Sequence, residues 1–93
     1  MPKGCPNCVI ALEELVQKIR TMTTKKYLSS SVAKRLELEI QEAIAESKKA
    51  TPDSKLIVGK LIDAKILIEG ISSASDLLNN FNETTTKVTK YLQ

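Results

Sequence analysis

Residues 51–81 read TPDSKLIVGKLIDAKILIEGISSASDLLNNF, and this stretch decides the fold. Apolar or small residues recur in it at alternating spacings of four and three, which places them on one side of a helix. This row consists of Ile57, Leu61, Ala64, Ile68, Ile71, Ser75 and Leu78. Thr51 is suited to the N-cap and Pro52 to the first helical position. The stretch therefore predicts a long third helix over residues 52–80.

A second row of apolar and small residues widens the apolar face of this helix. It consists of Leu56, Leu67, Gly70, Ala74, Leu77 and Phe81. The first row alone has the heptad spacing of a coiled coil, whereas the wider face is typical of a helix in a bundle. A helix over 52–80 would be roughly 43 Å long, while a compact domain of this size has a radius of gyration of about 12 Å. We therefore expect the helix to bend at Gly70 or to project from the bundle.

A projecting helix with an apolar seam needs a partner. We expect that partner to be a second copy of the chain, with a dimer as the simplest case, or another helical protein. The expected interaction face consists of Leu67, Ile71, Ala74, Leu77, Leu78 and Phe81.

Two further helices precede this stretch, over residues 7–23 and 31–49. Asn7 is the expected N-cap of the first, and Ser29 to Ser31 offer caps for the second. Residues 1–6 form an irregular lead, and residues 83–93 predict a short, weakly ordered tail helix. The expected core is Leu12, Leu15, Ile19, Leu36, Ile40, Ile44, Ile57, Leu61, Ile68, Ile71 and Leu78. The prediction is one all-α domain over 1–93, a three- or four-helix bundle around an antiparallel hairpin of the second and third helices.

The composition excludes several classes of protein. The 93 residues include no His, which removes the commonest general base and the commonest metal ligand. One Phe and two Tyr cannot form a stacking platform for single-stranded nucleic acid. No apolar run reaches the ~18 residues of a membrane span, and no apolar leader is apparent, so we expect a cytoplasmic protein. We expect no enzymatic activity and no cofactor.

Cys5-Pro6-Asn7-Cys8 is the motif that most resembles a chemical site. In the cytoplasm both thiols would stay reduced, with Cys8 a small core residue and Cys5 an exposed thiol. The spacing also suits a redox dithiol or half of a zinc site. Because zinc takes four ligands, a metal site at Cys5 and Cys8 would need two copies of the chain. Zinc-bridged or disulfide-linked dimerisation is therefore an alternative function.

Basic residues gather around the junction of the first two helices. They are Lys18, Arg20, Lys25, Lys26, Lys34 and Arg35. Such a cluster could neutralise phosphates or lie on an anionic surface, which is a second alternative function. The net charge of +3 is far below that of typical nucleic-acid-binding domains, and the acidic residues 36–50 offer an internal partner.

From Tyr27 onward the chain resembles short helical segments of bacterial conflict-system and effector-associated proteins. The resembling segments are Ala33 to Glu37, Glu42-Ala43, Thr51 to Asp53, Leu61 to Lys65 and Leu67 to Gly70. The resemblance implies a small helical module that mediates assembly. The expected function is therefore protein–protein interaction or self-assembly without catalysis.

Overall fold

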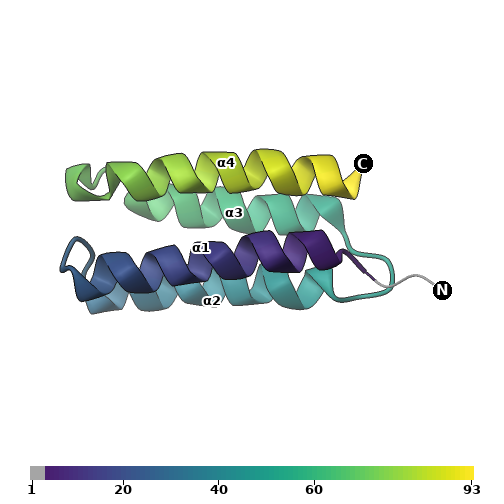
Figure 1. Cartoon of the computed structure of the whole chain (residues 1–93), viewed down its shortest axis with the longest axis horizontal. Helices are drawn as coiled ribbons and strands as arrows, with labels where there is room; N and C mark the ends of the chain where they lie inside the picture. The colour runs from purple at the N-terminus through teal and green to yellow at the C-terminus, as the bar shows by residue number, and fades with distance from the viewer. Residues whose placement is uncertain (1–3) are drawn as a thin grey trace.

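Four antiparallel helices account for most of the chain (Figure 1). The computed structural model describes residues 4–93. The helices are α1 (Pro6–Thr24), α2 (Ser30–Ser47), α3 (Ser54–Ile68) and α4 (Ser75–Leu92), and a single 3-10 turn, η1 (Ser72–Ala74), precedes α4. No strand occurs within these described residues. The predicted all-α bundle is confirmed.

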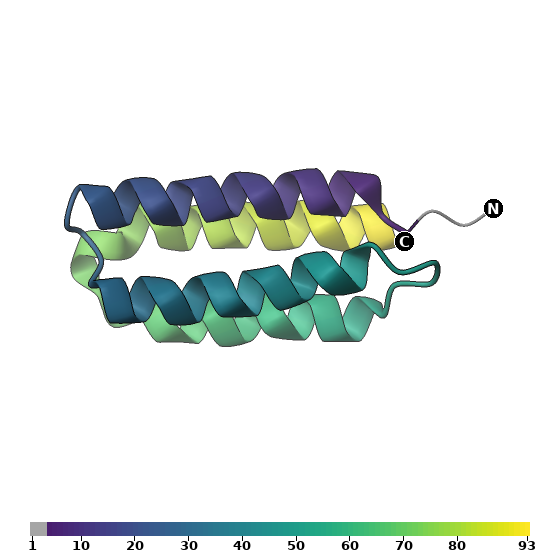
Figure 2. The same ribbon diagram turned by 90° about the horizontal axis from the view of Figure 1, so that it is seen from below.

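Each helix packs against two others around a common core. α1 contacts α2 and α4, and α3 contacts the same two helices. Figure 2, seen from below, shows α1 beside α4 and α2 beside α3. The expected hairpin of the second and third helices is present as α2 and α3. The described bundle is 43 Å long and 18 by 16 Å across.

The prediction of a single long helix over 52–80 is wrong. α3 ends at Ile68, and Ile71 has extended backbone angles that a helix cannot contain. The Ser73 hydroxyl donates a hydrogen bond to the carbonyl oxygen of Tyr27 at 2.9 Å, which ties the break to the turn between α1 and α2. The chain therefore reverses beside Gly70, where a bend was one of the two expected outcomes, and α3 does not project.

The reversal also changes which residues of the C-terminal third form the core. In α3 the predicted row is correct, since Ile57, Leu61, Ala64 and Ile68 are buried. In α4 the buried residues lie one position earlier in the sequence than the row predicted for one continuous helix. These buried residues are Ala74, Leu77, Phe81, Thr84 and Val88. Ile71 and Leu78, expected in the core, are only half-buried, whereas the other nine expected core residues are buried.

The predicted tail helix over 83–93 is not a separate element. These residues continue α4 without interruption to Leu92. Val88 is fully buried and anchors this part of α4 on the core.

The N-terminal caps differ from those expected at two of the three helices. α1 begins at Pro6, and its N-cap is Cys5, two residues before the expected Asn7 cap. The Asp53 carboxylate, not Thr51, caps α3 by accepting the backbone N–H groups of Lys55 at 3.0 Å and Leu56 at 3.2 Å. A carboxylate suits this position because it also faces the positive end of the helix dipole.

Glu46 holds the connection between α2 and α3. Its carboxylate accepts the backbone N–H of Asp53 at 3.0 Å and lies 3.0 Å from the Lys49 ammonium. These two interactions, the first the stronger, hold the pKa of Glu46 below its ordinary value of 4.5. The carboxylate is therefore charged at neutral pH and fixes the start of α3.

Candidate functional site

Half of the expected interaction face is part of the bundle core. Ala74, Leu77 and Phe81 are fully buried inside the single chain. Leu67, Ile71 and Leu78 are half-buried and pack against that core. These three buried residues cannot contact a partner while the bundle is folded. The predicted interaction face over 67–81 is therefore wrong for these three.

The largest group of exposed aliphatic side chains lies instead on the outside of α3. Nine of the 15 residues of α3 are Leu, Ile, Val or Ala, yet only four residues of the helix are buried. Ile62 is 47% exposed, Ile66 is 59% exposed and Leu56 is 40% exposed. A helix that is apolar around most of its circumference is normally covered on all sides. α3 is covered on one side only.

Two of these exposed residues, together with two half-buried neighbours, follow helical spacing and form what we call the outer α3 stripe. The stripe consists of Val58, Gly59, Ile62 and Ile66. Spacings of three and four place its members on one face. The stripe was not predicted from the sequence, because the apolar residues of α3 were all assigned to one broad core face. The signal was present in the uninterrupted runs Leu56-Ile57-Val58 and Ile66-Leu67-Ile68, because three consecutive residues cannot all lie on one face of a helix.

A groove runs beside the outer α3 stripe, between α3 and the end of α4. Its volume is about 470 Å³. Its lining consists of Ser54, Lys55, Val58, Gly59, Ile62, Thr89, Leu92 and Gln93. The Thr89 hydroxyl already donates to the carbonyl oxygen of Thr85 at 2.8 Å, so it does not need a partner from solvent. The stripe and the groove together form a continuous, mainly apolar surface.

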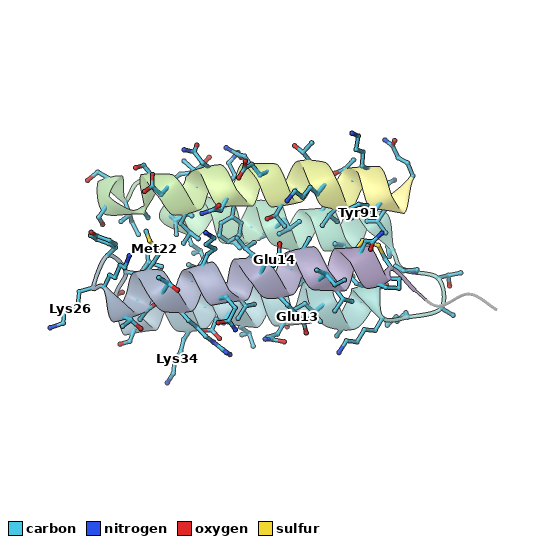
Figure 3. The ribbon with its side chains drawn as sticks, in the orientation of Figure 1. Glu13, Glu14, Met22, Lys26, Lys34 and Tyr91 are labelled. Atoms are coloured by element: carbon cyan, nitrogen blue, oxygen red, sulfur yellow. A yellow bond between two sulfur atoms is a disulfide. The ribbon has the colours of Figure 1, made fainter. Side chains whose placement is uncertain are left out.

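The CxxC motif lies where α1 begins, at the end of the bundle that also holds Tyr91 (Figure 3). Cys5 and Cys8 form a disulfide, contrary to the expected reduced thiols. Cys8 is fully buried as expected, but Cys5 is only 8% exposed and is not the exposed thiol that was predicted. The Cys5 backbone N–H donates to the Ser47 carbonyl oxygen at 2.7 Å, which joins the start of α1 to the end of α2.

Gly4 explains why the chain enters the bundle so closely. Its φ angle of 76° lies in the left-handed region, and a Cβ there would lie 2.5 Å from the Ser47 carbonyl oxygen. Only glycine fits both the backbone angle and the space. Together with the Cys5–Cys8 bridge, Gly4 holds residues 4–5 against the end of α2, and residues 1–3 of the predicted lead lie outside the described residues.

The geometry of the bridge favours a structural role over redox exchange. Thiol–disulfide exchange needs an external thiolate to reach a sulfur, and both cysteines are buried. Within residues 4–93 no group of three or more potential metal ligands lies together. A zinc site between two copies would require the bridge to be reduced first, and it stays a prediction.

We expect loss of the bridge to lower the stability of the bundle without unfolding it. Closing so short a loop stabilises a protein by about 2 kcal/mol in the chain-entropy account. The Cys5→Ala/Cys8→Ala variant should therefore melt roughly 10 °C below the oxidised native chain. Calorimetry with and without a reductant measures this. The reductant should lower the melting temperature of the native chain and leave the variant unchanged, and equal melting temperatures for oxidised and reduced native chain would contradict the structural role.

The predicted basic cluster is exposed and lies toward the end of the bundle where α1 turns into α2. Figure 3 shows Lys26 at that turn and Lys34 pointing away from α2. Arg20 is engaged, since its guanidinium donates to one oxygen of Glu37 from Nη2 at 3.2 Å and from Nε at 3.3 Å. Lys26 has a φ angle of 66°, a left-handed position usually taken by glycine at a helix end. The six residues do not share one hollow, since Lys18 lies beside Glu83 and Lys87 of α4, and Arg20 is paired internally.

None of the helices within residues 4–93 is long and apolar enough to span a membrane. Comparison of the chain with family models, with curated proteins and with solved structures gave no match.

Proposed function

We propose that this protein is a non-enzymatic helical interaction module that binds a helical partner through the outer α3 stripe and the adjoining groove. The observation that carries the proposal is the exposure of Ile62 and Ile66 on a helix that is already apolar on its buried side. Of the seven large exposed hydrophobic side chains in the described structure, three belong to α3, and two of these, Ile62 and Ile66, lie on the outer α3 stripe. The others are Ile10 on α1, Tyr27 in the first turn, Leu38 on α2 and Tyr91 on α4. Single exposed residues are ordinary, but a contiguous row marks an interaction site.

This proposal keeps the function expected from the sequence but gives it a different surface and a different reason. The reason from sequence was a projecting third helix, and α3 does not project. The new reason is that α3 is packed into the bundle while the aliphatic residues on its outer face remain exposed to solvent. The aliphatic lining of the groove supports binding rather than catalysis.

Binding of nucleic acid or of an anionic surface through the basic cluster remains the alternative. The left-handed position of Lys26 is one feature that favours it, because such a position usually selects glycine. The net charge of +3 and the Arg20–Glu37 pair weigh against it. Resemblance to assembly modules of bacterial conflict systems also stays a prediction, and it agrees with the interaction proposal.

The cytoplasmic location expected from the sequence is opposed by one observation. Disulfides persist in oxidising compartments and are rare in the cytoplasm. The Cys5–Cys8 bridge therefore favours an oxidising environment. Alkylation of free thiols in intact cells, followed by a mass measurement, distinguishes the two locations.

Photo-crosslinking tests the interaction surface. A photoreactive amino acid in place of Ile62 should give a covalent adduct in the cells that produce the protein. The same amino acid in place of Leu38, which is 62% exposed on α2, is the matched control and should give none. An adduct with twice the mass of the chain indicates a second copy, and an adduct of any other mass indicates a different protein. Either adduct supports the interaction module. No adduct at position 62, or equal adducts at both positions, would refute it.

A further inference from the structure

We propose that the partner on the outer α3 stripe is a second copy of this chain, packed antiparallel about a two-fold axis at Ile62. This inference rests on the proposed function, because it names the occupant of the same surface. Homodimers with a two-fold axis use the same patch on both copies, so the patch must be complementary to itself. The outer face of α3 meets this condition in both apolar contacts and charge.

The apolar part of the stripe is symmetric about Ile62. Val58 lies four residues before Ile62, and Ile66 lies four residues after it. At about 1.5 Å per residue, each lies roughly 6 Å from the centre along the helix axis. A two-fold axis at Ile62 therefore sets Val58 of one copy beside the partner's Ile66, with Ile62 against its own equivalent.

The charges at the two ends of the stripe are opposite and equally spaced from the same centre. Lys55 lies seven residues before Ile62, and Glu69 lies seven residues after it. Both are exposed, and within residues 4–93 neither side chain forms an ion pair. Antiparallel packing sets Lys55 of each copy beside the partner's Glu69 and so creates two pairs. Parallel packing would set like charges together, and repulsion would disfavour it.

Gly59 lets a second helix approach this centre. A Cβ at Gly59 would meet nothing within 4 Å, so no contact inside the chain requires glycine there. Glycine in a helix interior costs about 1 kcal/mol relative to alanine. A second helix seated beside Ile62 would use the space that this glycine leaves. Because one helix face is smaller than a standard interface, we expect a dimer of only micromolar affinity.

Charge exchange at positions 55 and 69 tests the arrangement. Lys55→Glu alone and Glu69→Lys alone each place like charges together at both ends of the interface. Each variant should self-associate roughly tenfold more weakly than the native chain at low salt, the effect expected of two surface pairs. An equimolar mixture of the two variants restores opposite charges at both ends. The mixture should therefore form a heterodimer with an affinity near that of the native homodimer.

Sedimentation equilibrium of each variant and of the mixture gives these affinities. The matched control is the pair Lys34→Glu and Glu83→Lys. These variants have the same net charges as the test pair, but they change residues on α2 and α4. Mixing the control pair should give no gain over its separate members. Recovery of affinity in the mixture of Lys55→Glu and Glu69→Lys, but not in the control mixture, supports the antiparallel dimer.

Two results would overturn this inference, and they differ in what they mean for the proposed function. A native dimer that is indifferent to both charge variants refutes the Lys55–Glu69 pairing but leaves the interaction module intact. A native chain that stays monomeric while Ile62 crosslinks to a different protein refutes the second copy and again leaves the module intact. The module itself fails only if position 62 gives no specific adduct.

Discussion

Replacing Phe81 by alanine is expected to lower the free energy of unfolding by about 3–5 kcal/mol, the usual cost of emptying a buried aromatic site. Phe81 is fully buried among the residues of the core. A 93-residue domain has a total stability of roughly 5–14 kcal/mol, so this change removes a large share of it. Urea denaturation followed by circular dichroism measures the loss.

The matched control for Phe81→Ala is Leu38→Ala, on the exposed outside of α2. This change should alter stability by no more than about 0.5 kcal/mol. If Phe81→Ala does not fold, Phe81→Leu leaves a smaller cavity and should still be measurably destabilised. A Phe81→Ala variant as stable as the native chain would mean that Phe81 lies outside the core, as the sequence-based interaction face implied.

The helix faces were predictable from the sequence wherever a helix is continuous. In α1 and α2 the spacing of apolar residues identifies the buried side, and Leu12, Ile19, Leu36 and Ile40 are all buried. In α3 the same reasoning holds as far as Ile68. Periodicity is sufficient here because one regular helix has one constant phase.

The break between α3 and α4 was not predictable from periodicity, because the row of spacings continues across it. Gly70 and the Ser72-Ser73 pair signal a turn, but each is tolerated within a helix. The reversal is secured by the contact of Ser73 with Tyr27, which is 46 positions away in the sequence. Such a contact exists only in the folded chain and cannot be read from local sequence. Without it, the buried positions of α4 are predicted one residue too late.

The disulfide and the outer α3 stripe show two further limits of the sequence. Spacing allowed Cys5 and Cys8 to be free, bridged or metal-bound, and only their position at the start of α1 brings the sulfurs together. The stripe became visible once the buried side of α3 was known, since the exposed residues are those that remain.

Replacing Ile62 by lysine should abolish self-association without harming the fold. Ile62 is 47% exposed, so a lysine there remains hydrated in the monomer. In the proposed dimer the two introduced ammonium groups would meet at the two-fold axis, where both lose water and repel each other. We expect the dissociation constant to rise at least about 100-fold, while the melting temperature measured at low concentration stays near that of the native chain.

Leu38→Lys is the matched control for Ile62→Lys, because it introduces the same charge at an exposed aliphatic position on α2. It should leave self-association unchanged. Equal effects of the two variants would indicate a general response to added charge rather than loss of a contact at α3.

Sedimentation equilibrium over a range of concentrations is the sharpest test of whether the uncovered face of α3 joins two copies of this chain. We expect the mass of the native chain to rise from 10.3 kDa toward twice that value across the micromolar range. We expect Ile62→Lys to stay at the monomer mass throughout. A native chain that remains at 10.3 kDa up to millimolar concentration, or an Ile62→Lys variant that dimerises as the native chain does, would contradict this dimer.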